Sequence, residues 1–140
     1  MTKEERIYTS AKRVGVCSLL KGTESTEELI ELLFTPQGME FCSIHNFPSM
    51  AELAPFRGEQ ASSGGVYINT PVQVKNCSRV ALFGRDTVAE LEYDDPTKRH
   101  EVLIMHGASV KIKASGYAVV FVTNAGGTVE TEIRDSAKVL

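Results

Sequence analysis

Three basic side chains in the second half of the chain have the chemistry to bind a small anion. Arg79 and Arg85 flank the segment VALFG, and guanidinium groups form paired hydrogen bonds with phosphate and carboxylate. His106 precedes Gly107 at the end of a predicted strand, and an imidazole can change its charge near neutral pH. If the fold brings the arginines together, they could clamp an anion under the SSGG segment at 62–65. Solvated arginines at chain corners are the commoner arrangement.

Cys42 and His45 stand three residues apart in MEFCSIHNFPS, close enough on one helical turn to share a metal or to form a nucleophilic pair. A zinc site needs two more ligands at comparable spacing, but the other cysteines and histidines are isolated: Cys17, Cys77, His100 and His106. Nothing near Cys42 marks an oxyanion hole or an orienting acid. We therefore predict a buried cysteine, a histidine near the helix entrance at Pro48, and no metal.

The remaining charged and glycine-rich motifs are weak. Asp94 and Asp95, followed by Pro96 and TKRH, are typical of a long exposed turn. The segments SSGG and NAGG lack the strand-to-helix setting and the Lys-Ser/Thr pair of a phosphate loop. Because no set of residues supplies a nucleophile, a base and a stabilising group, we expect no catalytic residues, no cofactor and no enzymatic activity.

Composition places the chain among ordinary globular proteins. It has 140 residues and a net charge of −3, and neither half has an excess of basic residues, so nucleic acid is an unlikely partner. The sequence has no apolar run long enough to cross a membrane and no apolar signal-peptide core, which predicts a protein of the host cytosol, with association with a virion as the alternative. Three widely spaced cysteines favour reduced thiols over a disulfide framework.

The elements that must position these residues differ between the two halves. In residues 1–58 a Ser or Thr stands three residues before a Glu at three places, which predicts a capping box at the start of three helices: Thr2 with Glu5, Ser25 with Glu28 and Ser49 with Glu52. The helices are expected at about 3–14, 26–34 and 49–56. Residues 59–65, EQASSGG, have the composition of a flexible loop.

Residues 66–140 are predicted to be rich in strands. Val, Ile and Thr number 22 there, against 10 in residues 1–65, and short apolar alternations recur every 8 to 12 residues between turns. This pattern fits a small β-solenoid or an antiparallel β-sandwich or barrel, and the corners HGA, ASG and NAGG favour the solenoid. We predict an α+β fold, one compact domain overall, in which the N-terminal helices cap the solenoid.

A solenoid needs both ends covered, because its terminal turn exposes unpaired backbone and apolar interior. The N-terminal helices are available for one end, whereas the chain finishes at AKVL with nothing left for the other. We therefore expect a homo-oligomer, or another protein partner, at the C-terminal end.

Several short segments resemble a known family: GMEFC at 38–42, HNFPS at 45–49, GVYIN at 65–69, the end of VALFG, and the tail containing HGASV and SGYAVVFV. The chain is similar from about residue 27 onward to an uncharacterised family of small proteins from phages and prophages of gut Bacteroidales. Glu40 departs from the aspartate usual in that family. The resemblance implies a phage context and a β-solenoid tail, short in this chain, and brings no catalytic residues.

Two hypotheses of function follow. The first is a non-enzymatic, oligomeric structural or protein-interaction module, encoded by a phage or prophage, which binds itself and another phage or host protein. The second is a small-ligand-binding protein that sequesters an anionic host signal molecule through Arg79, Arg85 and His106.

Overall fold

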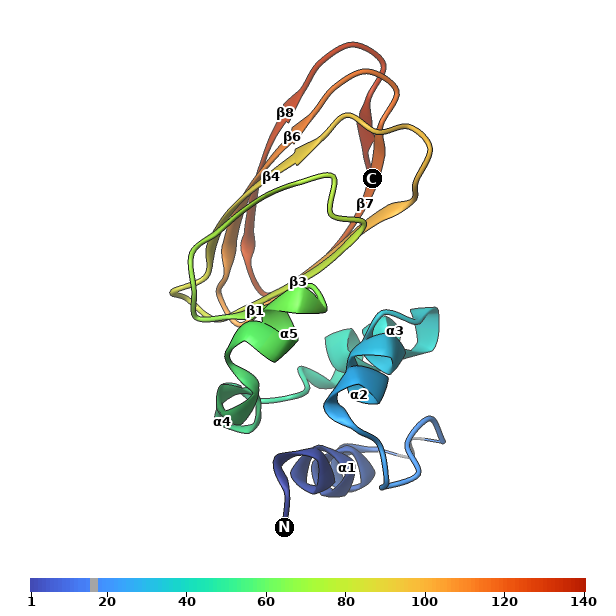
Figure 1. Ribbon diagram of the computed structural model, residues 1–140, viewed down its shortest axis with the longest axis vertical. Helices are drawn as coiled ribbons and strands as arrows, with labels where there is room; N and C mark the ends of the chain where they lie inside the picture. The colour runs from blue at the N-terminus through green and yellow to red at the C-terminus, as the bar shows by residue number, and fades with distance from the viewer. Residues whose placement is uncertain (16–17) are drawn as a thin grey trace. The chain divides into compact units, whose positions relative to one another are not determined.

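The computed structural model describes residues 1–15 and 18–140, and the chain divides into two compact units, Met1–Gly64 and Gly65–Leu140. The first unit is helical and the second is built of strands, so the fold is α+β (Figure 1). This confirms the predicted fold class. No helix in the described part of the chain is both long enough and apolar enough to cross a membrane.

The helical unit begins its helices where the capping boxes predict. Its elements are α1 (Lys3–Val14), α2 (Thr26–Leu33), α3 (Pro36–His45), α4 (Met50–Leu53), the 3₁₀ helix η1 (Ala54–Phe56) and α5 (Glu59–Ser63). Thr2, Ser25 and Ser49 each accept a hydrogen bond from the backbone N–H three residues on, and the glutamate at that position accepts from the cap N–H.

Two helices were not predicted from the sequence. Pro36 ends the preceding helix, as predicted, but it also occupies the first position of α3. A backbone N–H at that position would have no partner within the helix, so proline is tolerated there. Thr35 caps α3, because its hydroxyl accepts a hydrogen bond from the Gly38 N–H. Residues 59–63 form the short helix α5 instead of a loop. Ala61 lies on its inner side with 2% of its surface exposed, so burial of a small residue stabilises a segment whose composition alone indicates a loop.

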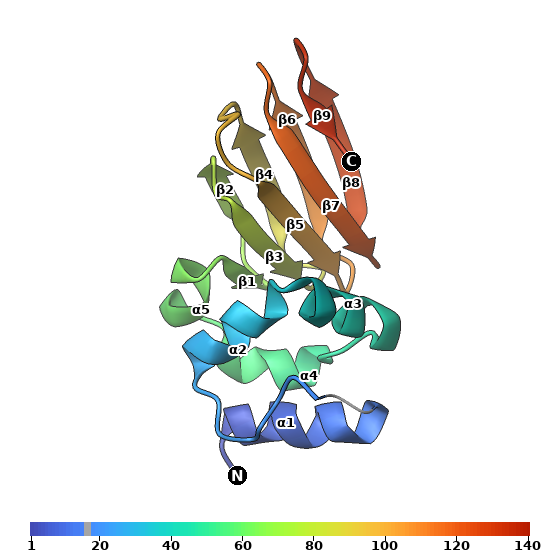
Figure 2. The same cartoon turned by 90° about the vertical axis from the view of Figure 1, so that its right-hand side faces the viewer.

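The second unit is a parallel β-solenoid. Its strands are β1 (Val66–Ile68), β2 (Val72–Lys75), β3 (Arg79–Phe83), β4 (Val88–Tyr93), β5 (His100–Met105), β6 (Ser109–Ala114), β7 (Val119–Ala125), β8 (Thr128–Ile133) and β9 (Lys138–Val139). The odd-numbered strands form one sheet, here called sheet A, in the order β1-β3-β5-β7-β9, and the even-numbered strands form sheet B in the order β2-β4-β6-β8. Figure 2 shows the successive turns stacked side by side. Every pairing is parallel, which excludes the antiparallel sandwich or barrel.

The interior of the coil is filled by columns of aliphatic side chains. Equivalent residues of neighbouring turns lie in register, so that Val80 stacks on Val102 and Leu82 on Ile104 in sheet A, and Leu91 stacks on Ile112 in sheet B. These residues are at most 1% exposed. Sheet A also carries buried apolar residues such as Phe83 and Leu103 on its other face, whereas the outer face of sheet B is charged.

The corners of the coil explain why glycines recur between the short apolar segments of the sequence. At the turn that follows each full strand of sheet A, the chain takes a positive φ, at Gly84 (102°), His106 (58°) and Gly126 (116°). Glycine adopts this left-handed conformation without the steric cost that a Cβ imposes. Beside it, a Cβ on Gly127 would meet Ile104 Cγ2 and the Ala108 carbonyl oxygen, so this corner has no space for a side chain.

Candidate functional site

The most regular surface feature of the solenoid is a ladder of charges on the outer face of sheet B. Alternate residues of its strands point outward, and their charges change sign from each turn to the next: Gln73 and Lys75 on β2, Glu90 and Glu92 on β4, Lys111 and Lys113 on β6, Glu130 and Glu132 on β8. Because the strands are parallel and in register, Glu92, Lys111 and Lys113 each lie between two charges of opposite sign. We call this set the charge ladder.

Direct contacts hold the middle of the charge ladder. Lys113 Nζ lies 2.7 Å from Glu90 Oε1, diagonally across the two strands. The hydrogen bond from Lys113, and then its charge, lower the pKa of Glu90, and the same contact raises the pKa of Lys113. Opposite charges on neighbouring strands favour this register, because a one-residue slip would point the charged side chains into the core.

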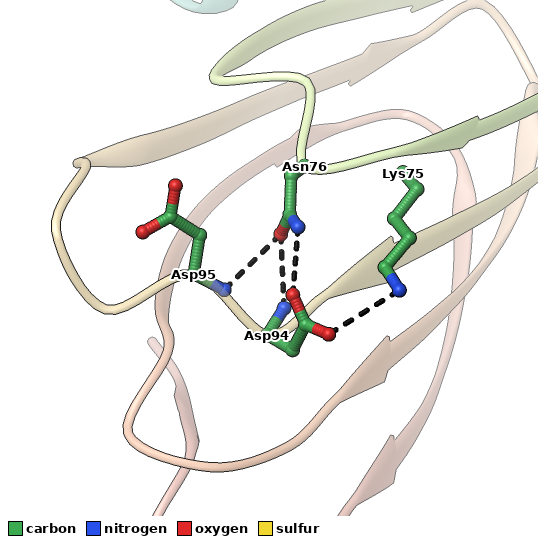
Figure 3. A network of polar contacts seen from close by, with 4 residues as sticks. All are labelled: Lys75, Asn76, Asp94 and Asp95. Atoms are coloured by element: carbon green, nitrogen blue, oxygen red, sulfur yellow. Dashed lines mark hydrogen bonds and ion pairs between the residues drawn. The ribbon is translucent and has the colours of Figure 1, made fainter.

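A polar network closes the corner between the first two turns (Figure 3). Asn76, with a φ of 53°, donates from Nδ2 to Asp94 Oδ1 at 2.7 Å, and its Oδ1 accepts from the N–H groups of Asp94 and Asp95 at 2.9 and 3.2 Å. Lys75 Nζ lies 3.3 Å from Asp94 Oδ2. The bond from Asn76, followed by the contact with Lys75, lowers the pKa of Asp94. These contacts account for the Asp-Asp pair as structural groups of the corner.

The long turn after Asp94 is ordered by its own side chains. Asp95 Oδ1 accepts from both the hydroxyl and the N–H of Thr97, at 2.6 and 2.9 Å, and this lowers the pKa of Asp95. Arg99 Nε donates to Glu101 Oε1 at 2.7 Å, and its guanidinium lies 4.0 Å from the centre of the Phe121 ring. Arg99 is therefore held by a residue of the strand that follows it and by one aromatic ring of the next turn.

Two polar aromatic residues lie inside the coil behind this corner. Tyr93 and His100 are both fully buried, with their ring centres 4.6 Å apart. His100 Nε2 lies 2.9 Å from the Asp95 carbonyl oxygen, which can only accept, so this nitrogen carries the proton. Among the described residues, the Tyr93 hydroxyl and His100 Nδ1 have no hydrogen-bond partner. Burial raises the pKa of Tyr93, which keeps the phenol neutral.

The last turn of the solenoid is open. β8 pairs with β6 on one side and stands at the edge of sheet B on the other. Thr128 donates its N–H to the Ala108 carbonyl just before β6, and Arg134 donates to the Ala114 carbonyl at its end. Alternate residues of a parallel strand direct their backbone groups to opposite sides, so Val129, Thr131 and Ile133 present N–H and C=O groups to the open side. Ile133 and Leu140 leave 48% and 63% of their surfaces exposed at this end.

The structure separates the three residues predicted to bind an anion. Arg79 begins β3 and Arg85 follows its end, so the five-residue strand, about 13 Å between its first and last Cα atoms, lies between them. Arg85 and His106 belong to the same corner of successive turns, where the Arg85 side chain packs over Gly107, the residue after His106. The coil therefore does not bring the two arginines together, as the clamp requires. Both Arg79 and His106 make further contacts of their own.

The side chains of Cys42 and His45 lie in different surroundings, although both residues belong to α3. Cys42 is buried on the inner side of α3, whereas His45 is exposed near its end and stacks on Phe41 with ring centres 4.5 Å apart. The described residues contain no group of three or more His, Cys, Asp or Glu side chains placed to hold a metal ion. Cys42 and Cys77 form no disulfide, and Cys17 lies outside the described residues.

Sequence reasoning missed the charge ladder, although its signal is visible. The strings AELE, KIK and ETE alternate charged and uncharged residues, and the charge changes sign from one string to the next. Only the register of the turns shows that these strings are neighbours. Comparison of the chain with protein-family models, with curated proteins and with solved structures gave no match.

Proposed function

We propose that this protein is a non-enzymatic, oligomeric structural or protein-interaction module that binds copies of itself and, through the solenoid, another phage or host protein. The observation that carries the proposal is that, among the described strands, β8 has a neighbour on one side only, beside exposed Ile133 and Leu140. An edge of this kind favours the addition of a further strand. The phage or prophage origin and the host cytosol as its location rest on the resemblance and composition of the sequence.

Native mass spectrometry of the purified full-length chain tests the proposal. We expect species at multiples of 15.3 kDa, without added mass, whose abundance rises with protein concentration. A chain that remains monomeric at every concentration would contradict the proposal, and so would turnover of a substrate by the purified protein.

The second candidate function is the sequestration of a small anion. It is favoured by one observation, that the Arg85 side chain packs over Gly107, next to His106, at one corner of the coil. The same mass spectra distinguish it, because a sequestering protein purified from cells would carry a stoichiometric added mass. Arg85→Ala should then remove that mass and Arg79→Ala, at the other end of β3, should leave it in place.

A further inference from the structure

The solenoid ends in a fraction of a strand. β9 covers only the start of β7, with Lys138 beside Val119 and Val139 beside Val120. Leu140 completes this short ladder, since it donates to the Val120 carbonyl at 2.8 Å and accepts from the Val122 N–H at 2.9 Å. In the described sheet, residues 123–125 of β7 therefore have no neighbouring strand on this side.

The solenoid also begins with a short strand, β1, which covers the part of a strand position that β9 leaves uncovered at the other end. β1 pairs with the end of β3, where Val66 is in register with Ala81. Ala81 is in register with Leu103, and Leu103 with Thr123. By this register, β1 occupies the position along the strand that corresponds to residues 123–125 of β7, which is the part that β9 leaves uncovered.

We propose that the open edge of β7 and β8 is a docking surface for a second copy of this chain, which binds head to tail with its β2 beside β8 and its β1 beside the uncovered end of β7. β9 of the first copy and β1 of the second then share one strand position without overlapping. The proposal deepens the oligomeric function proposed above and rests on it.

The backbone groups at the two ends match. Directly after β2, the Asn76 N–H donates to the Glu92 carbonyl of β4, so Gln73 and Lys75 direct their backbone groups to the open side. On either side of β1, the Gly65 carbonyl accepts from Ala81 and the Asn69 N–H donates to Phe83, both on β3. This leaves the backbone groups of Val66 and Ile68 directed outward. In the proposed register, Gln73 and Lys75 of the second copy meet the outward groups of Val129, Thr131 and Ile133, and Val66 meets those of Val122 and Asn124.

The charge ladder continues across this junction. The described part of sheet B has four strands, and the sign of the outward charges alternates with each strand, so its last strand is acidic and its first carries Lys75. Head-to-tail binding places Lys75 of the second copy beside Glu132, and Gln73 beside Glu130. These side chains have room to move, since 57% of the Lys75 side chain and 43% of the Glu132 side chain are exposed.

A two-fold arrangement of the same ends fits less well. Tail-to-tail antiparallel pairing of β8 with itself, centred on Thr131 so that the inward side chains stay on one face, sets Glu130 against Glu132 of the partner copy. Directly opposed like charges destabilise a sheet. Head-to-tail binding also continues the interior columns, with Val72 over Val129 and Val74 over Thr131. Since a head-to-tail contact of stacked coils does not close on itself, it produces a series of sizes instead of one oligomer.

Two proline variants test the arrangement by sedimentation velocity. Thr131→Pro removes an N–H that faces the open side of β8, and Gln73→Pro removes one that faces the open side of β2, so neither loses a hydrogen bond within the chain. Each variant alone should sediment as a monomer, because every copy lacks one competent end. A 1:1 mixture should form a dimer and no larger species, because one junction remains possible. Thr131→Val and Gln73→Ala keep the N–H groups and should assemble as the wild type does.

The outcomes separate the two proposals. A wild-type chain that is monomeric throughout contradicts the proposed oligomeric function itself. A wild-type oligomer that persists in Gln73→Pro alone, or in Thr131→Pro alone, or a mixture of the two that stays monomeric, contradicts only the head-to-tail arrangement.

Charge reversal repeats the test without proline, in case either proline variant does not fold. Glu132→Lys opposes two lysines at the junction and Lys75→Glu opposes two glutamates, so each alone should associate more weakly than the wild type. Mixing them restores opposite charges at every junction and should restore the series of sizes. Failure of the mixture to associate better than either variant alone would contradict the proposed register.

Discussion

Asn76 joins two successive turns of the solenoid with a single side chain. Its amide donates to the carboxylate of Asp94 and accepts from two backbone N–H groups, while its own backbone takes the left-handed conformation. Asparagine suits both tasks, because its short polar side chain reduces the cost of that conformation and bonds to nearby backbone. Asn76 therefore has a structural role at this corner, and the contacts of Asp94 and Asp95 with Asn76 connect the first two turns of the coil.

Tyr93 allows a direct test of the interior behind this corner. Its hydroxyl is buried without a partner among the described residues, and an unpaired buried polar group costs about 1–3 kcal/mol. Tyr93→Phe should therefore leave the free energy of unfolding unchanged or raise it by about 1 kcal/mol, as measured by urea denaturation. Tyr117→Phe, at a side chain that is 73% exposed, is the matched control and should have no effect. A loss of about 1 kcal/mol in Tyr93→Phe alone would mean that the hydroxyl is bonded in the folded protein.

At the scale of the elements, the two sheets of the solenoid perform different tasks. Sheet A has apolar residues on both faces, whereas sheet B buries one face and exposes the charge ladder on the other. Because the sign of the charge alternates, pairing each strand with a strand of opposite charge is more stable than pairing it with a strand of the same charge. This arrangement fixes the order of the strands, and at the last strand it leaves an acidic edge that favours a basic neighbour.

The contact between Glu90 and Lys113 predicts a dependence of stability on pH. The pKa of Glu90 is lowered in the folded protein from its ordinary 4.5, so the stabilisation is complete above pH 4.5 and is lost as the pH falls below it through the folded value. The advantage of the wild type over Glu90→Gln in urea denaturation should therefore shrink as the pH is lowered from 7 to below 4.5. In a Lys113→Gln background most of this dependence should disappear, because the first cause of the lowered pKa is gone. A difference that stays constant with pH would contradict the role of the contact.

At the scale of the whole molecule, the feature with the largest consequence is that the solenoid begins and ends at complementary points of one turn. The last residue of the chain lies beside residues 120–122 of β7, and β1 corresponds to residues 123–125. In the head-to-tail arrangement proposed above, a second copy continues the described strands, charges and interior columns in register.

Salt provides a test at this scale. If the junction depends on Lys75 and Glu132, raising sodium chloride from about 0.05 to about 0.5 M should shift wild-type sedimentation towards the monomer, because screening weakens exposed charge pairs. Glu132→Gln should associate more weakly at low salt and respond less to the increase. If the wild type and Glu132→Gln respond equally, the paired charges do not contribute to association.

The sequence by itself determined the local structure of this protein. The three capping boxes specify helix starts through contacts three residues apart, and the β-branched alternation with glycine corners specifies short strands, so both were predictable from neighbouring residues. The prediction of a loop at residues 59–63 was wrong, because burial of Ala61 stabilises the short helix α5, which the local composition does not indicate.

Only the tertiary structure decided which distant residues become neighbours. The predicted anion site fails to converge because a full strand separates Arg79 from Arg85, a distance that depends on where the coil places its corners. The charge ladder and the complementary ends depend on the register of strands far apart in the chain, such as β2 and β8. Register is set by the packing of the whole interior, since a slip of one residue would expose every buried column, and no short segment of sequence contains that information.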